Sequence, residues 1–182
     1  MCGIAGYFNP DQNYAENPKQ NFHTLSRMIN TMNHRGPDTY GHTIINSCCL
    51  AHTRLSIIDL ENGRQPMSYT KDGNTYYIVY NGEIYNYKEV KKTLLRKNYT
   101  FETNSDTEVI IAAFCHYGPG FVKELNGIFA IAIYDSMRNT LYLYRDRFGV
   151  KPLYYTKTGD TLVFASRIDT LFEYPRVRPC ID

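Results

Sequence analysis

The stretch Ile128-Phe129-Ala130-Ile131-Ala132-Ile133-Tyr134 is apolar at every position. A strand with one face in water alternates between apolar and polar residues, so a strand that is apolar throughout must be covered on both faces. Turn signals separate neighbouring strand-like segments at Asp72-Gly73, Met137-Arg138-Asn139 and Thr158-Gly159-Asp160. These short turns predict hairpins and therefore mainly antiparallel sheets. The expected strands are 41–45, 48–52, 76–80, 128–134, 140–144, 152–156 and 161–165.

Three helices are expected between the strands. Apolar residues recur at three- and four-residue intervals from Phe22 to Met32, and the pattern ends before Gly36-Pro37. A second helix starts after Asn86, where Glu89 follows at capping distance. Its basic row reads as a solvated face rather than a nucleic-acid site, and consists of Lys88, Lys92 and Arg96.

The third helix has the clearest start signal. Ser105-Asp106-Thr107-Glu108 has the spacing of a capping box and precedes an apolar run, so Asp106 falls in the first turn. Three helices cannot cover both faces of every strand, so two sheets must pack on each other with the helices outside. The sequence therefore predicts an α+β fold, a four-layer αββα sandwich of two mainly antiparallel sheets.

Length and charge limit the classes of function. A single core suffices for 182 residues, because a chain of this size can bury roughly 70% of its unfolded surface, and we expect one domain over residues 1–182. Twenty Lys plus Arg against 18 Asp plus Glu give a net charge of +2, too weak to indicate nucleic acid or an anionic membrane as a partner. No segment reaches the ~18 apolar residues of a membrane span. The five cysteines include no C-x-x-C pair, so we expect a reducing, cytoplasmic location.

Cys2 is the first candidate for chemistry. Met1 is expected to be removed because a small residue follows it, which would leave Cys2 with a thiol and a free α-amine of ordinary pKa about 8.5 and 8. Nucleophile and base would then share one residue, as in the N-terminal-amine variant of nucleophilic catalysis. Gly3 and Gly6 would let other main chain approach this strand closely. The competing interpretation of Cys2 is a small buried hydrophobic residue near a frayed end.

Five sequence blocks, the first of which contains Cys2, help to interpret this residue. They are Cys2-Gly3-Ile4-Ala5-Gly6, His34-Arg35-Gly36-Pro37-Asp38, His52-Thr53-Arg54-Leu55-Ser56-Ile57-Ile58-Asp59, Asn81-Gly82-Glu83-Ile84-Tyr85-Asn86 and Arg145-Asp146-Arg147-Phe148-Gly149-Val150-Lys151-Pro152-Leu153-Tyr154. From Cys2 to about Phe172 the chain resembles the glutaminase domain of asparagine synthetase, a class II glutamine amidotransferase. The resemblance implies an N-terminal nucleophile hydrolase fold. It also implies that L-glutamine is hydrolysed to L-glutamate and ammonia through a Cys2 thioester.

The same resemblance implies roles for the other blocks. The side-chain amide of Asn81 and the N–H of Gly82 match the donors for the tetrahedral oxyanion, each worth about 3 kcal/mol of barrier. The competing interpretation of this pair is a hairpin turn, because Asn-Gly is the strongest short turn signal, and the pair could be both.

Arg54 matches the group that binds the substrate α-carboxylate, a task that suits the guanidinium fork. Asp106 matches the group that binds the α-ammonium, and its place at a helix start favours the ionised carboxylate. Without the resemblance, helix capping would be preferred for Asp106. Glu83 is expected to share the ammonium contact. Main-chain atoms of four consecutive residues are expected to line the pocket: Leu55, Ser56, Ile57 and Ile58.

No metal or cofactor is expected for this domain. His34, His52 and His116 lack the tetrahedral spacing of a zinc site with the cysteines. Arg35 and Asp38 are expected to brace the loops around Cys2.

Two features depart from the family. Arg167 stands where an acidic residue is usual, which puts in doubt a contact with the neighbouring domain. The Ser-Gly-Gly-x-Asp-Ser pyrophosphate loop of the synthetase domain does not occur, so ATP and Mg²⁺ would belong to a C-terminal synthetase domain outside these 182 residues. That domain is the expected partner, and a homodimer stays open. Two alternatives also stay open: another acceptor, such as a peptide, sugar or antibiotic precursor, and a non-catalytic glutamine-binding or interaction module.

Overall fold

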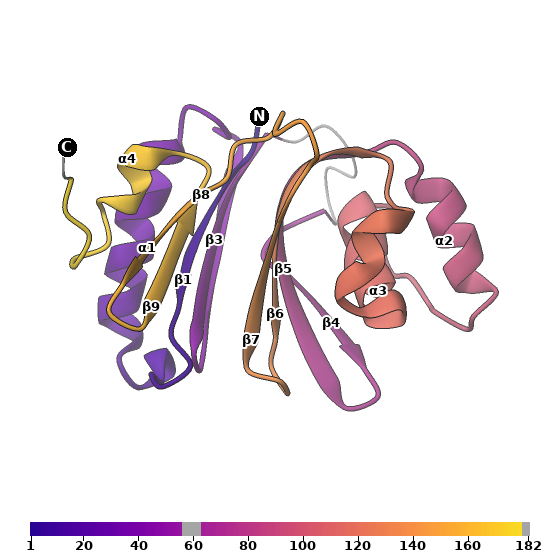
Figure 1. Ribbon diagram of the computed structural model, residues 1–182, viewed down its shortest axis with the longest axis horizontal. Helices are drawn as coiled ribbons and strands as arrows, with labels where there is room; N and C mark the ends of the chain where they lie inside the picture. The colour runs from indigo at the N-terminus through magenta and orange to yellow at the C-terminus, as the bar shows by residue number, and fades with distance from the viewer. Residues whose placement is uncertain (56–62, 180–182) are drawn as a thin grey trace.

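The computed structural model describes residues 1–55 and 63–179. Two β-sheets pack face to face, and helices cover the outer face of each sheet (Figure 1). The layers follow the order helix, sheet, sheet, helix. This confirms the four-layer αββα sandwich expected from the sequence.

The first sheet has five strands in the order β2-β3-β1-β9-β8, and all neighbours are antiparallel. Its strands are β1 (Gly3–Phe8), β2 (Thr39–Ile45), β3 (Cys48–Arg54), β8 (Tyr154–Thr158) and β9 (Thr161–Ala165). Strand β8 begins two residues later than expected, because Pro152 has no N–H to give to a β-ladder. Strand β1 is central, so Cys2 lies at the end of the middle strand.

The second sheet has four antiparallel strands in the order β4-β5-β6-β7. They are β4 (Met67–Lys71), β5 (Asn74–Ile84), β6 (Gly127–Asp135) and β7 (Thr140–Arg145). The expected turn at Asp72-Gly73 joins β4 to β5, with φ values of 50° and 78°. Strand β4 itself is not among the expected strands. It lies at the sheet edge, where its residues are half-buried or exposed.

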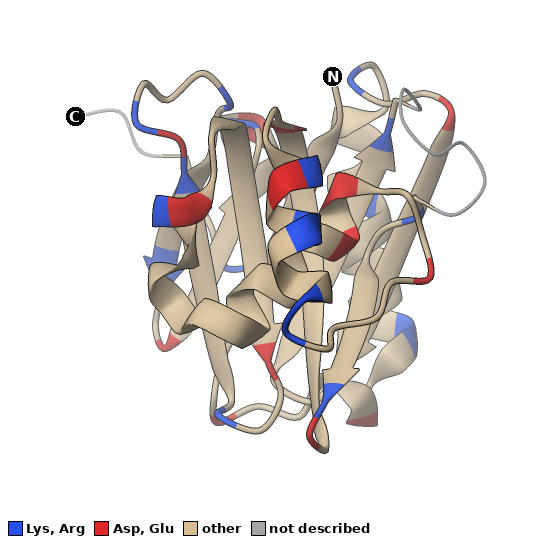
Figure 2. Ribbon diagram, turned by 90° about the vertical axis from the view of Figure 1, so that its right-hand side faces the viewer, with Lys and Arg blue, Asp and Glu red and all other residues tan. Residues whose placement is uncertain are grey.

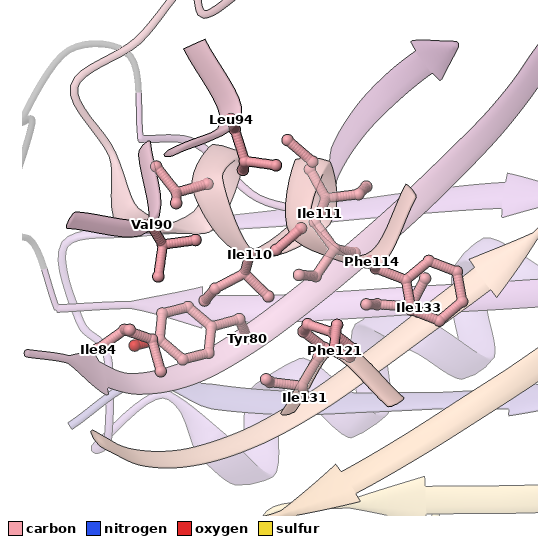
Figure 3. Packing of buried hydrophobic residues seen from close by; sticks show 14 of the residues in the cluster. Tyr80, Ile84, Val90, Leu94, Ile110, Ile111, Phe114, Phe121, Ile131 and Ile133 are labelled. Carbon is pink, nitrogen blue, oxygen red and sulfur yellow. The ribbon is translucent and has the colours of Figure 1, made fainter. Parts of the chain in front are cut away.

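Strand β6 contains the apolar stretch that decides the fold. Phe129, Ile131 and Ile133 belong to the cluster beneath α2 and α3, shown in Figure 3 for the two isoleucines. The alternate residues Ala130 and Ala132 belong to the cluster between the sheets. Both faces of β6 are covered, as predicted.

Two helices cover each sheet. They are α1 (Pro18–Met32) and α4 (Ile168–Leu171) on the first sheet, and α2 (Tyr87–Leu95) and α3 (Asp106–Tyr117) on the second (Figure 1). Short 3₁₀ helices lie at Tyr14–Glu16 and Gly118–Glu124. Helix α1 buries Leu25 and Met32 as expected, but Phe22 is 47% exposed. The Phe22 ring instead contacts the His42 ring at a centroid distance of 4.8 Å.

The predicted helix caps form only in part. Ser105 Oγ accepts the N–H of Thr107, so Ser105 is the N-cap as expected, through the second residue of the helix. Glu108 does not complete the box, because its carboxylate accepts the N–H groups of Glu102 and Thr103 in the preceding loop. Asn86 precedes α2 but its side chain makes no cap, since it bonds main-chain atoms of residues 124 and 126.

The outer face of the second sheet's helices carries both signs of charge (Figure 2). Lys88, Lys92 and Arg96 of the expected basic row are exposed, at and just after α2. Within the described part of the chain, no helix is long and apolar enough to cross a membrane.

Candidate active site

A cavity of about 180 Å³ opens beside Cys2. Its walls come from segments far apart in the sequence: the N-terminus, the end of β3, the end of β5, the start of α3 and the loop after β7. The lining residues are Met1, Cys2, His52, Arg54, Leu55, Gly63, Gln65, Tyr80, Asn81, Gly82, Glu83, Ser105, Asp106, Thr107 and Lys151. Each described residue of the predicted site is among them. The remaining predicted residues, Ser56, Ile57 and Ile58, lie outside the described residues.

The Cys2 sulfur lies against the end of β3. The N–H of Leu55 donates to Sγ at 3.4 Å, and Sγ lies 3.7 Å from the carbonyl oxygen of Leu55. Arg35 Nε donates to the Cys2 carbonyl at 3.1 Å, in agreement with the expected bracing role. Met1 is present in this structure, so the Cys2 nitrogen is a peptide amide. Lys151 Nζ lies 3.5 Å from the Met1 sulfur at the cavity wall.

Close packing around β1 fixes the position of Cys2. A Cβ atom on Gly6 would lie 2.3 Å from the carbonyl oxygen of Cys49, so main chain approaches there as predicted. At Gly3 the nearest groups are instead side chains, with Thr53 Oγ1 at 2.7 Å from such a Cβ. Strand β1 can therefore lie this close to β3 only because Gly6 has no side chain.

Asn81 and Gly82 lie within β5 and not in a turn. They pair with Ala130 and Phe129 of β6, so the hairpin-turn interpretation is wrong. A Cβ on Gly82 would lie 2.2 Å from the Ile128 carbonyl oxygen, which explains the need for glycine. The Asn81 side chain is buried, and its Nδ2 has no hydrogen-bond partner among the described residues. An unpaired buried amide donor in a cavity is the feature that an oxyanion site requires.

The charged residues of the predicted site surround the same cavity. Arg54, at the end of β3, is 6% exposed, and Glu83 is exposed at the rim. Asp106 is also 6% exposed, and its Oδ2 accepts the Tyr80 hydroxyl at 2.9 Å and the Ile84 N–H at 3.4 Å. Burial raises the pKa of Asp106, while these hydrogen bonds act in the opposite direction. Burial therefore opposes the effect of the helix start on the Asp106 pKa and is the larger of the two.

Several lining residues were not predicted from the sequence. His52 forms part of the wall, and neither ring nitrogen has a hydrogen-bond partner within the described residues. Burial, with a smaller effect of Arg54, lowers the pKa of His52 to about 3, so the ring is neutral near pH 7. Gln65 and Tyr80 carried no sequence signal, because their contacts join residues distant along the chain. No group of His, Cys, Asp and Glu in residues 1–55 and 63–179 could hold a metal ion.

Arg167, the departure from the family pattern, lies outside the cavity lining. Its guanidinium pairs with Asp169 at 2.5 Å and contacts His34 Nε2 at 2.8 Å. Burial, and to a smaller extent the charge of Arg167, lower the pKa of Arg35. The changed residue therefore acts electrostatically on the side chain that supports the Cys2 carbonyl.

The chain is similar to several known proteins. Asparagine synthetase [glutamine-hydrolyzing] 3 of Bacillus subtilis is 40% identical over 182 residues, which are the whole of this chain and 29% of the relative. Amidase chyE of Penicillium rubens is 36% identical over 96% of this chain and 26% of its own length. The chain thus spans less than a third of these relatives.

A solved structure shows the same fold. Glutamine phosphoribosylpyrophosphate amidotransferase from B. subtilis superposes with a TM-score of 0.71 at 20% identity, over 93% of this chain and 42% of that one. This likeness confirms the fold, an α+β sandwich of two antiparallel sheets with outer helices. The model of the glutamine amidotransferase domain matches residues 1–182. The chain belongs to the glutamine amidotransferase domain family.

Proposed function

We propose that this chain hydrolyses the side-chain amide of L-glutamine, with Cys2 as the nucleophile after removal of Met1. One observation carries the proposal: a single cavity combines the Cys2 thiol, the unpaired Asn81 amide, a guanidinium and a buried carboxylate. These groups match the reacting carbon, the oxyanion and the two charges of a free amino acid. No cofactor is needed for this reaction.

The reaction proceeds in two steps. Cys2 Sγ bonds to the amide carbon while the thiol proton passes to the freed α-amine, and Asn81 and Gly82 donate to the oxyanion. The carbon–nitrogen bond then breaks, and the same proton goes to the departing nitrogen, which leaves as ammonia. Water attacks the thioester, releases glutamate and restores the thiol. The N–H of Leu55 can stabilise negative charge on sulfur during these steps.

Arg54 and Asp106 position the substrate in this proposal. A guanidinium binds the α-carboxylate through two parallel hydrogen bonds, and the carboxylate of Asp106 binds the α-ammonium. Glu83, at the rim, adds a second negative charge. Leu55 also lines the cavity, and its main-chain N–H faces Cys2 Sγ.

The test measures processing and turnover in the same sample. Intact mass is expected to show loss of Met1, and the chain is expected to release ammonia and glutamate from glutamine. Cys2→Ala is expected to abolish the reaction, whereas the matched variant Cys115→Ala, on α3 and outside the cavity lining, keeps it. Glutamine hydrolysis by Cys2→Ala would overturn the mechanism, and retained Met1 in an active enzyme would overturn the role of the α-amine.

The fate of the ammonia depends on a partner domain. Because the chain matches 29% of a glutamine-hydrolysing asparagine synthetase, we propose that the ammonia is used by a linked synthetase domain with ATP and Mg²⁺. The similarity to amidase chyE, which is not named an asparagine synthetase, keeps a second candidate, the amidation of another acceptor. A polypeptide that joins this chain to such a domain is expected to form asparagine from aspartate. Glutamine hydrolysis without asparagine formation would favour the second candidate.

A further inference from the structure

The hydrogen bond between Tyr80 and Asp106 has no role in the mechanism described above. Tyr80 is 3% exposed and belongs to the cluster between the second sheet and its helices, where Figure 3 shows it beside Ile84. Its hydroxyl leaves this apolar cluster and donates to Asp106 Oδ2 at 2.9 Å. A buried hydroxyl that donates to a carboxylate is among the stronger side-chain hydrogen bonds in proteins.

Gln65 fixes the main chain of Tyr80. Strand β4 pairs with β5 only as far as Met67 and Ile78, so β4 does not reach the N–H of Tyr80. Gln65 Oε1 accepts that N–H at 2.6 Å, and Gln65 Nε2 donates to Thr107 Oγ1 at 3.3 Å. The Gln65 side chain therefore links β5 to the first turn of α3, which also contains Asp106.

Two donors act on the same oxygen of Asp106. Oδ2 accepts both the Tyr80 hydroxyl and the Ile84 N–H, which fixes the plane of the carboxylate. An ionised carboxylate has about four acceptor positions, so acceptor capacity is left for an ammonium group in the cavity. The hydroxyl of Tyr80 also favours the ionised form, because it opposes the effect of burial on the Asp106 pKa.

We propose that Tyr80 is a positioning residue that sets selectivity for the substrate α-ammonium by orienting the Asp106 carboxylate. The proposal rests on the function proposed above, in that it takes glutamine as the ligand. Tyr80 acts through Asp106 and does not touch the reacting atoms. Its loss is therefore expected to weaken binding of amino acids that carry the α-ammonium, and to spare ligands that lack it.

Tyr80→Phe tests this inference by binding, in a Cys2→Ala background where turnover is abolished. The two ligands are L-glutamine and glutaramate, which has the same carboxamide and carboxylate but no α-amine. Tyr80→Phe is expected to raise the calorimetric Kd for glutamine about tenfold, the usual effect of losing a hydrogen bond to a charged group. The Kd for glutaramate is expected to stay the same.

Tyr134→Phe is the matched control. Its hydroxyl donates to Asn139 Oδ1 at 2.9 Å, and its ring is 1% exposed, but it lies outside the cavity lining. It is expected to leave both Kd values unchanged. An equal loss for both ligands in Tyr80→Phe, or no loss for either, would overturn the inference. Failure of the unsubstituted chain to release ammonia would instead overturn the proposed function, since binding selectivity is measured separately from turnover.

Discussion

Asp106 and Asp146 are each 6% exposed, but their pKa values are shifted in opposite directions. Asp146 accepts four main-chain N–H groups, from Phe129, Phe148, Val150 and Lys151. Burial alone would raise its pKa, but together these hydrogen bonds bring it below the ordinary value. The pKa of Asp106 shifts upward, because its hydrogen bonds do not offset burial.

The comparison shows that burial does not determine what a carboxylate does. Asp146 is saturated by protein donors and fixes the loop between β7 and β8, so it has a structural role. The Tyr80 hydroxyl and the Ile84 N–H both donate to Oδ2 of Asp106, and Asp106 faces a cavity, so it can accept a ligand. The same substitution at the two positions should therefore have different consequences.

The largest expected effect is the loss of stability in Asp146→Asn. The substitution replaces an acceptor oxygen by an NH₂ group that cannot accept, so main-chain N–H groups lose their partner. Buried donors left unpaired cost about 1–3 kcal/mol each, and we expect the free energy of unfolding to fall by about 3 kcal/mol. Urea unfolding measures the change. An unchanged transition midpoint would show that the Asp146 hydrogen bonds contribute no net stability.

Asp106→Asn should lower the activity and not the stability. Removal of the charge that faces the α-ammonium is expected to lower kcat/KM for glutamine about a hundredfold, because a lost buried charge pair costs about 2–5 kcal/mol. Stability should rise or stay constant, since a buried charge is removed. Steady-state kinetics and urea unfolding of the same preparations test both parts. Equal activity in Asp106→Asn and the parent chain would contradict the binding role.

The pH dependence of stability should also separate the two positions. Asp146 has a lowered folded pKa, so its contribution is complete above the unfolded value of about 3.9 and is lost as the pH falls through the folded pKa. Asp106 has a raised folded pKa, so its ionisation reduces stability as the pH rises above about 3.9. Unfolding of the parent chain and of each Asn variant from pH 2 to 6 gives, by difference, how the contribution of each aspartate to the free energy of unfolding changes with pH. Contributions that change in the same direction would contradict the opposite pKa shifts of Asp106 and Asp146.

The coverage of both faces of β6 could be predicted because consecutive residues along this strand are apolar. Ala130 and Phe129 are both apolar although they face different layers. Cys2, Arg54, Asn81 and Asp106 could be brought together only through the family resemblance, since no local pattern relates them. The structure shows that they line one cavity, and their roles stay predictions.

The incorrect predictions rested on local sequence patterns, which contacts between residues distant along the chain override. Asn81-Gly82 has the composition of a turn, but pairing with β6 makes it part of a strand. Glu108 has the spacing of a capping residue, but the N–H groups of Glu102 and Thr103 take its carboxylate. The bond between Tyr80 and Asp106 spans 26 positions, so no periodicity could indicate it.

The most direct test of Cys2 as nucleophile is labelling with a glutamine-like electrophile, followed by mass analysis of the peptides. Burial raises the pKa of Cys48 and Cys49, and burial raises that of Cys115 to about 12, so these thiols should be unreactive near pH 7. We predict one adduct per chain, on Cys2, which excess glutamine prevents. An adduct on any other cysteine, or labelling of Cys2 that glutamine does not reduce, would contradict this account.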